Sequence, residues 1–143
     1  ILQVAMPPVH RETEFSMPIA HAPEALERLR AGIADRGLRV NFVVEVRFVA
    51  SDDTWLSPAY GRDSAQIGVY MAESADLAAY FALAAELWDA PTLRPHWGKE
   101  WVLPSATLLG RFPSGQRFKA LADRLDPHGR FRNQALRAVL GPA

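Results

Sequence analysis

Cysteine is absent from the 143 residues of this chain, which excludes disulfides, cysteine nucleophiles and cysteine metal ligands. The formal net charge is +0, because 16 basic residues balance 16 acidic ones. A balanced chain has no global field that would attract nucleic acid or an anionic membrane, so we expect neither as a partner. There is also no apolar run long enough to span a bilayer and no signal-peptide pattern, and the bacterial cytoplasm is the default location.

Common catalytic and metal-binding motifs are missing as well. The histidines are scattered and never take the HExxH spacing, so the sequence predicts no metal site. GxSxG, P-loop and GxGxxG patterns do not occur. The adjacent Asp52 and Asp53 have no further candidate ligands beside them, and we interpret them as turn-forming or capping residues.

The composition that is present is that of an ordinary folded domain. Hydrophobic residues make up 49% of the chain and charged residues 22%, which argues against a wholly disordered chain. The length suits one domain rather than two independent cores. Because the chain begins with Ile1 instead of methionine, we expect it to be a piece of a longer protein.

Hydrophobic spacing predicts both strands and helices. Alternation and β-branched composition predict strands and extended segments at 13–19, 41–50, 65–71 and 93–102. Helical spacing predicts one helix from about 23 to a glycine cap at 37 and a second from about Ser74 or Asp76 to Trp88. Weaker helical patterns occur around 118–125 and 135–140. Both faces of the 41–50 segment are mainly β-branched or aromatic, so we expect this strand to lie inside a sheet.

The order strand–helix–strand–strand–helix–strand is that of a split βαβ unit. The predicted fold class is therefore α+β, with an antiparallel sheet, a split βαβ (ferredoxin-like) core, two helices on one face and additional C-terminal helices. Sheets of this kind leave the second face free to meet a ligand, another domain or solvent.

Glu45 and Arg47 are the first candidate site residues. Their spacing on a strand places both side chains on one face, roughly 7 Å apart. A carboxylate that accepts from hydroxyls, beside a guanidinium that donates a planar fork of N–H groups, could bind a polyol. The alternative is an ordinary exposed ion pair, which contributes little to stability.

Lys99 stands out because only two of the 16 basic residues are lysines. A lysine can shift its pKa or present a compact point charge, neither of which arginine can do. Lys99 lies between Trp97 and Trp101 and close to His96. The alternative is a cation that packs against the tryptophan rings or pairs with Glu100.

Four motifs together resemble a known family. The run EVRFVASDDTWLSPAY (45–60) resembles the substrate domain of flavin-dependent alditol oxidases, which are relatives of the sugar-1,4-lactone oxidases in the vanillyl-alcohol-oxidase superfamily. PHWGK (95–99) is similar to that family's HWGK or HWAK signature, and LDPHGRFRN (125–133) to its closing segment. HRETEFSMP (10–18) is similar to the motif that opens the domain. The motifs follow the family order and span nearly the whole chain.

The resemblance implies an enzyme built in two parts. An N-terminal domain binds FAD, and a C-terminal cap domain covers the reacting face of the flavin. Residues 1–143 resemble the substrate-binding cap alone, and the FAD-binding domain is absent from this chain. The expected partners are that FAD-binding domain and a small polyol or sugar lactone, and the isolated fragment is expected to be inactive.

The resemblance also implies roles for particular residues. Glu45 and Arg47 would line the substrate pocket, and Lys99 would lie close to the flavin and the reacting hydroxyl. The family reaction moves a hydride from the carbinol carbon to the flavin, so Arg47 and Lys99 would stabilise developing alkoxide character while Glu45 orients the substrate. His96 would help to position substrate or flavin. Tyr70 occupies a substrate-binding position where relatives often carry threonine.

A hypothesis from another class stays open at this stage. The chain could be a free-standing, non-catalytic α+β module that binds a partner or dimerises through the open face of its sheet. The enzyme hypothesis differs because it requires Glu45, Arg47 and Lys99 to converge on one concavity.

Overall fold

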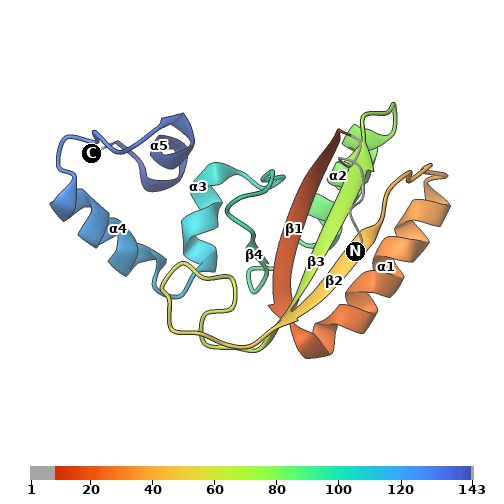
Figure 1. Cartoon of the computed structure of the whole chain (residues 1–143), viewed down its shortest axis with the longest axis horizontal. Coiled ribbons are helices and arrows are strands. Elements are labelled where there is room, and N and C mark those ends of the chain that lie inside the picture. The colour runs from red at the N-terminus through yellow and green to blue at the C-terminus, as the bar shows by residue number, and fades with distance from the viewer. Residues whose placement is uncertain (1–8, 143) are drawn as a thin grey trace, which may run out of the picture.

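A four-stranded antiparallel sheet organises the chain, whose structure, a computed structural model, describes residues 9–142. The strands lie in the order β2-β3-β1-β4 (Figure 1). Their bounds are β1 (His10–Pro18), β2 (Val44–Val49), β3 (Ser64–Ala72) and β4 (Arg94–Pro95). Every neighbouring pair is antiparallel, and the helical crossovers follow β1 and β3, which confirms the predicted split βαβ core.

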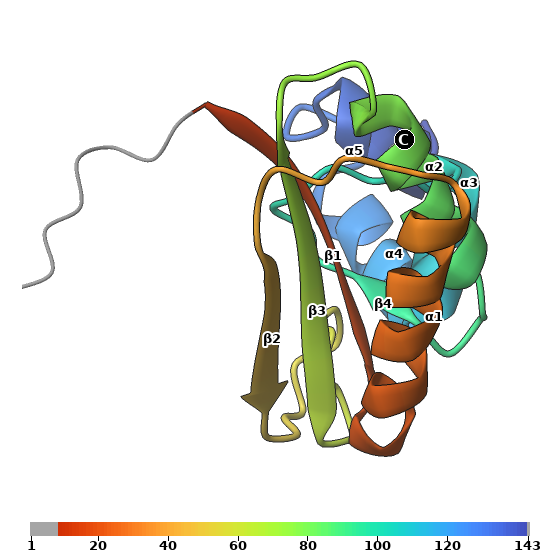
Figure 2. The same ribbon diagram turned by 90° about the vertical axis from the view of Figure 1, so that its right-hand side faces the viewer.

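Two helices, α1 (Ala22–Asp35) and α2 (Leu77–Leu87), cover one face of the sheet (Figure 2). Pro23 stands in the first turn of α1, where a missing N–H costs nothing, and Gly37 caps its end at a φ of 60°. Figure 2 shows that the opposite face carries no helix, as the sequence predicted. Among the described residues, no helix has the length and hydrophobicity that crossing a membrane requires.

The last third of the chain forms short helices beside β4 (Figure 1). They are α3 (Ser105–Leu108), the 3₁₀ turn η2 (Leu109–Arg111), α4 (Gly115–Leu125) and α5 (Gln134–Leu140), and a further 3₁₀ turn, η1 (Ile19–His21), precedes α1. The sequence predicted α4 and α5 but not the single turn of α3. Asn133 begins α5 as a side-chain cap, because its Oδ1 accepts from the Leu136 N–H at 2.9 Å.

One continuous core joins these layers. Phe15 and Met17 of β1 point toward the helices, and the Phe15 ring packs against Trp88 at a centroid distance of 5.6 Å. The same core includes Leu108 of α3 and Val139 of α5, so the C-terminal helices pack on the sheet domain rather than forming a core of their own.

The prediction that the 41–50 strand lies inside the sheet is wrong. β2 is an edge strand that pairs with β3 alone, and it begins only at Val44. Its helix-side residues are poorly covered, and the Phe48 side chain is 69% exposed. Apolar composition on both faces of a strand reports what the faces contact, but it does not report how many neighbours the backbone has.

The segment from 93 to 102 is extended, as predicted, but only two of its residues form a strand. Beyond β4 it follows β1 through single hydrogen bonds, from the His96 N–H to the Glu14 carbonyl and from the Glu100 N–H to the Glu12 carbonyl, both 3.0 Å. Lys99 lies in the turn between these two hydrogen bonds. This arrangement brings the PHWGK motif against β1.

Asp52 organises the long loop between β2 and β3, which agrees with its interpretation as a turn residue. Its carboxylate accepts from the Thr54 N–H at 3.0 Å and from the Ser57 hydroxyl at 2.5 Å. The Trp97 indole also holds this loop, because its Nε1 donates to the Leu56 carbonyl at 2.8 Å.

The core contains one polar group whose removal is expected to stabilise the protein. Tyr80 is fully buried, and its hydroxyl has no hydrogen-bond partner within residues 9–142. We expect Tyr80→Phe to raise the free energy of unfolding by up to about 1 kcal/mol, because an unsatisfied hydroxyl is removed while the ring stays. Burial raises the pKa of Tyr80 to about 12, so the wild type should also lose stability above about pH 10, where the phenol of the unfolded chain begins to ionise.

Urea unfolding of both proteins between pH 8 and 12 measures both effects. The difference in stability between variant and wild type should be constant near pH 8 and widen above about pH 10, because only the wild type carries this alkaline loss. A variant that is less stable than the wild type at pH 8 would show that the Tyr80 hydroxyl has a partner.

Candidate functional site

The open face of the sheet carries a row of charged side chains across three strands. Glu45 of β2 and Glu14 of β1 both lie opposite Gly68 of β3, one on each side of it. In the neighbouring row, Glu12 lies opposite Tyr70. Because side chains alternate along a strand, residues 12 and 14, 45 and 47, and 68 and 70 all share this face.

Arg47 is held between two carboxylates. Its Nη2 donates to both carboxylate oxygens of Glu14 at 2.7 Å, and its Nε lies 3.5 Å from Glu45 Oε2. Burial lowers the pKa of the Arg47 guanidinium, but the charge and hydrogen bond of Glu14 raise it more, so the pKa lies above its ordinary value. The Arg47 side chain is 45% exposed, whereas that of Glu14 is only 2% exposed. The Arg47 guanidinium is therefore partly exposed on the open face, while the Glu14 carboxylate that holds it is buried.

Lys99 pairs with Glu12 rather than with Glu100. Its Nζ donates to Glu12 Oε1 and lies 6.0 Å from the centroid of the Tyr70 ring. Glu100 instead pairs with Arg11. The tryptophans on either side of Lys99 contact each other in a T-shaped arrangement at 5.5 Å and join the core. Lys99 therefore does not take Glu100 as its carboxylate partner, and its ammonium faces the ring of Tyr70.

Tyr70 lies between Glu45, which contacts Arg47, and Lys99. Its hydroxyl donates to Glu45 Oε2 at 2.8 Å, and its ring lies near the Lys99 ammonium. Burial and the hydrogen bond to Glu45 raise the pKa of the Tyr70 phenol above its ordinary value. The phenol therefore stays protonated and remains a donor at neutral pH.

His96 joins the site through its main chain. Its N–H donates to the Glu14 carbonyl, while its ring Nδ1 accepts from the Gly98 N–H at 3.0 Å. The ring thus shapes the turn that presents Lys99. These contacts fix the PHWGK segment on β1. Glu45, Arg47, Lys99 and Tyr70 form one connected group, because Glu45 contacts both Arg47 and Tyr70 and the Lys99 ammonium lies near the Tyr70 ring.

Comparison of the sequence with known protein families shows which family this chain belongs to. A family model described as "D-arabinono-1,4-lactone oxidase" matches residues 4–139. The chain belongs to the D-arabinono-1,4-lactone oxidase family.

Curated relatives of this family member carry names from the same area of chemistry. An L-gulono-1,4-lactone dehydrogenase of Mycobacterium tuberculosis is 43% identical over 131 residues, which cover 92% of this chain and 31% of the relative. An alditol oxidase of a Streptomyces species is 37% identical over 130 residues, which cover 90% of this chain and 31% of that relative. An L-gulonolactone oxidase of Scyliorhinus torazame is 33% identical over 129 residues, which cover 87% of this chain and 29% of that relative. The chain thus spans less than a third of the length of these relatives.

Two carboxylates of this D-arabinono-1,4-lactone oxidase family member were missed by the sequence analysis. Glu12 and Glu14 hold Lys99 and Arg47 by their side chains, and their carbonyls accept from the N–H groups of Glu100 and His96. The signal was present in HRETEFSMP, where two glutamates alternate with the core residues Thr13 and Phe15. Their partners depend on strand register, which no local pattern reveals.

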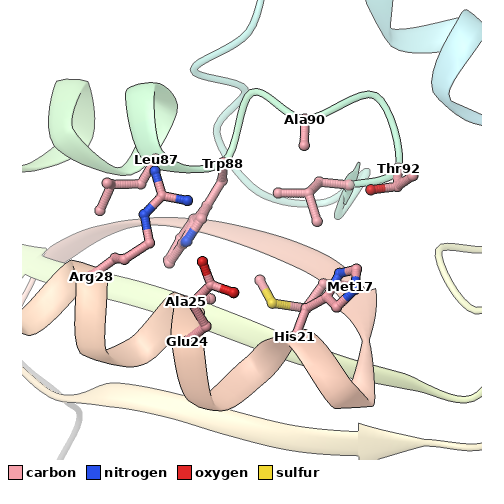
Figure 3. A pocket seen from close by; sticks show the side chains of 10 residues that line it. Met17, His21, Glu24, Ala25, Arg28, Leu87, Trp88, Ala90 and Thr92 are labelled. Atoms are coloured by element: carbon pink, nitrogen blue, oxygen red, sulfur yellow. The ribbon is translucent and has the colours of Figure 1, made fainter.

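A pocket of about 230 Å³ lies on the other side of the sheet, between α1 and the end of α2 (Figure 3). Its lining includes Glu24 and Arg28 of α1, together with Trp88. None of the predicted site residues lines it. Within residues 9–142, no three His, Asp or Glu side chains are grouped closely enough to hold a metal ion.

Proposed function

We propose that this chain is the substrate-binding cap domain of an FAD-dependent oxidoreductase, which oxidises a CH–OH group of a polyol or sugar lactone. The observation that carries the proposal is the connected group of Glu45, Arg47, Lys99 and Tyr70 on the open face of a lactone oxidase family domain. A group of paired cations and carboxylates beside an aromatic ring suits a neutral ligand that is rich in hydroxyls.

The charges of the open face also bear on how FAD would be held. Arg47 and Lys99 are each paired with a carboxylate, and Glu45 adds a third acid, so the group carries three acids for two cations. Such a surface fits the uncharged rings of a flavin and of a substrate, but it does not fit the two phosphates of FAD. We therefore propose that another part of the protein, outside this sequence, binds the phosphates, while His96 and Lys99 lie near the flavin.

The chain's own residues would bind and polarise the substrate. FAD, when bound, would accept the hydride from the carbinol carbon. Arg47 and Lys99 would donate hydrogen bonds to the hydroxyl oxygen, which gains negative charge as its proton passes to water. Glu45, which keeps an oxygen free of the Tyr70 contact, would accept from a second hydroxyl and so orient the substrate. The bacterial cytoplasm remains the expected location.

The proposal is tested with the complete protein that contains this chain, loaded with FAD and kept free of oxygen. We expect L-gulono-1,4-lactone, or the alditol of equal carbon number, to bleach the visible absorbance of the flavin. The 143-residue chain alone, mixed with the same compounds and free FAD, is expected to give no bleaching. If no sugar lactone and no polyol reduces the flavin of the complete protein, the proposal is wrong.

A further inference from the structure

We infer that the Tyr70 ring, laid against Gly68, is the specificity-determining element of the open face and selects a cyclic sugar lactone over an open-chain polyol. This inference rests on the proposed function and deepens it. It goes beyond the family assignment because it names the pair of residues that makes the choice and the feature of the substrate that they select.

The position of the ring depends on a glycine. A strand side chain normally stands roughly perpendicular to its sheet, yet the Tyr70 ring leans along β3 over residue 68. A Cβ added at Gly68 would lie 2.7 Å from Tyr70 Cε2 and 3.2 Å from its hydroxyl oxygen. Any side chain at position 68 would therefore push the ring away from the sheet, so Gly68 and Tyr70 act as one unit.

The ring is also held at its edges. Its hydroxyl donates to Glu45 at 2.8 Å, and the Phe42 ring packs beside it at a centroid distance of 6.2 Å, tilted by 23°. The His10 ring lies 5.7 Å from the Tyr70 ring and stacks on Phe42 at 4.8 Å. These contacts come from β1 and from the stretch that contains Phe42 and Glu45, and they hold the ring in position before any ligand arrives.

A fixed aromatic surface among charged groups discriminates by shape. A sugar lactone ring has C–H faces and carries its oxygens around the rim, so a face can lie on Tyr70 while the rim meets Arg47 and Lys99. An open-chain polyol has a hydroxyl on every carbon, and any hydroxyl that is pressed against the ring loses its hydrogen bonds, which is costly.

The test compares kcat/KM for L-gulono-1,4-lactone with kcat/KM for the alditol of equal carbon number, using the FAD-loaded complete protein. We expect the wild type to prefer the lactone. Tyr70→Thr, which removes the ring and keeps a hydroxyl, should lower the lactone-to-alditol ratio by about tenfold or more, the size typical of reshaping a pocket. Gly68→Ala should shift the ratio in the same direction, because the new methyl group displaces the ring.

Tyr70→Phe is the matched control, since it keeps the ring and removes only the bond to Glu45. We expect it to hold the ratio within about threefold, although both values of kcat/KM fall. The flavin spectrum and the thermal midpoint of each variant report whether the holoenzyme is folded. A wild type that prefers the alditol, or a ratio that Tyr70→Thr and Gly68→Ala leave unchanged, overturns this inference alone. A wild type that oxidises neither compound overturns the proposed function as well.

Discussion

Replacing Arg47 with alanine is expected to lower kcat/KM of the FAD-loaded complete protein by about 100- to 1,000-fold, the loss typical of removing one donor to a developing negative charge. The same substitution should weaken the fold, because it leaves the buried Glu14 carboxylate without its cation. We expect the free energy of unfolding to fall by about 1–3 kcal/mol, the cost of an unsatisfied buried acceptor. Steady-state kinetics and urea unfolding measure the two effects.

The two effects are separable through Glu14. In the double variant Glu14→Gln/Arg47→Ala, the buried charge is gone, so most of the lost stability should return while the activity stays low. Arg30→Ala is the matched control, because Arg30 also pairs with a glutamate but does so on the exposed side of α1, where ion pairs contribute little. Activity within threefold of the wild type in Arg47→Ala would remove Arg47 from the site.

Much of the fold was predictable because local rules decide it. Pro23 and Gly37 mark the two ends of α1, and the spacing of Leu77, Phe81 and Trp88 marks the buried face of α2. The place of β2 in the sheet was not predictable in this way. A strand becomes an edge through what pairs with its backbone, and the residues of β2 are as apolar as those of an inner strand.

In the candidate site, too, local contacts were predictable from the sequence and contacts between strands were not. Glu45 and Arg47 share a face by the period of a strand, so their proximity followed from the sequence. The neighbour that anchors Arg47 did not, because Glu14 is 33 residues away and reaches it only through the register of β1 and β3. The position of the Tyr70 ring depends on the absence of a side chain at Gly68, which became informative only when the register was known.

Lys99→Ala is expected to lower kcat of the complete protein by about 100-fold, with a smaller rise in KM, because the ammonium would act mainly on charge that develops during the reaction. Lys99→Arg should recover only part of the loss. The ammonium is a compact charge held between Glu12 and the Tyr70 ring, and a planar guanidinium on a stem of different length cannot take the same position.

Lys119 provides the matched control, since it is the second lysine of the chain and pairs with Asp123 four residues away along α4. Lys119→Ala should leave kcat and KM within about twofold, because a helix-surface pair contributes only tenths of a kcal/mol. Glu12→Gln then shows whether Glu12 only positions the Lys99 ammonium or acts on the substrate itself. If Glu12 only positions Lys99, the glutamine variant keeps the ammonium and should lose less kcat than Lys99→Ala. An equal loss would mean that the carboxylate itself acts on the substrate, and Glu12 would then join Glu45 as a binding residue.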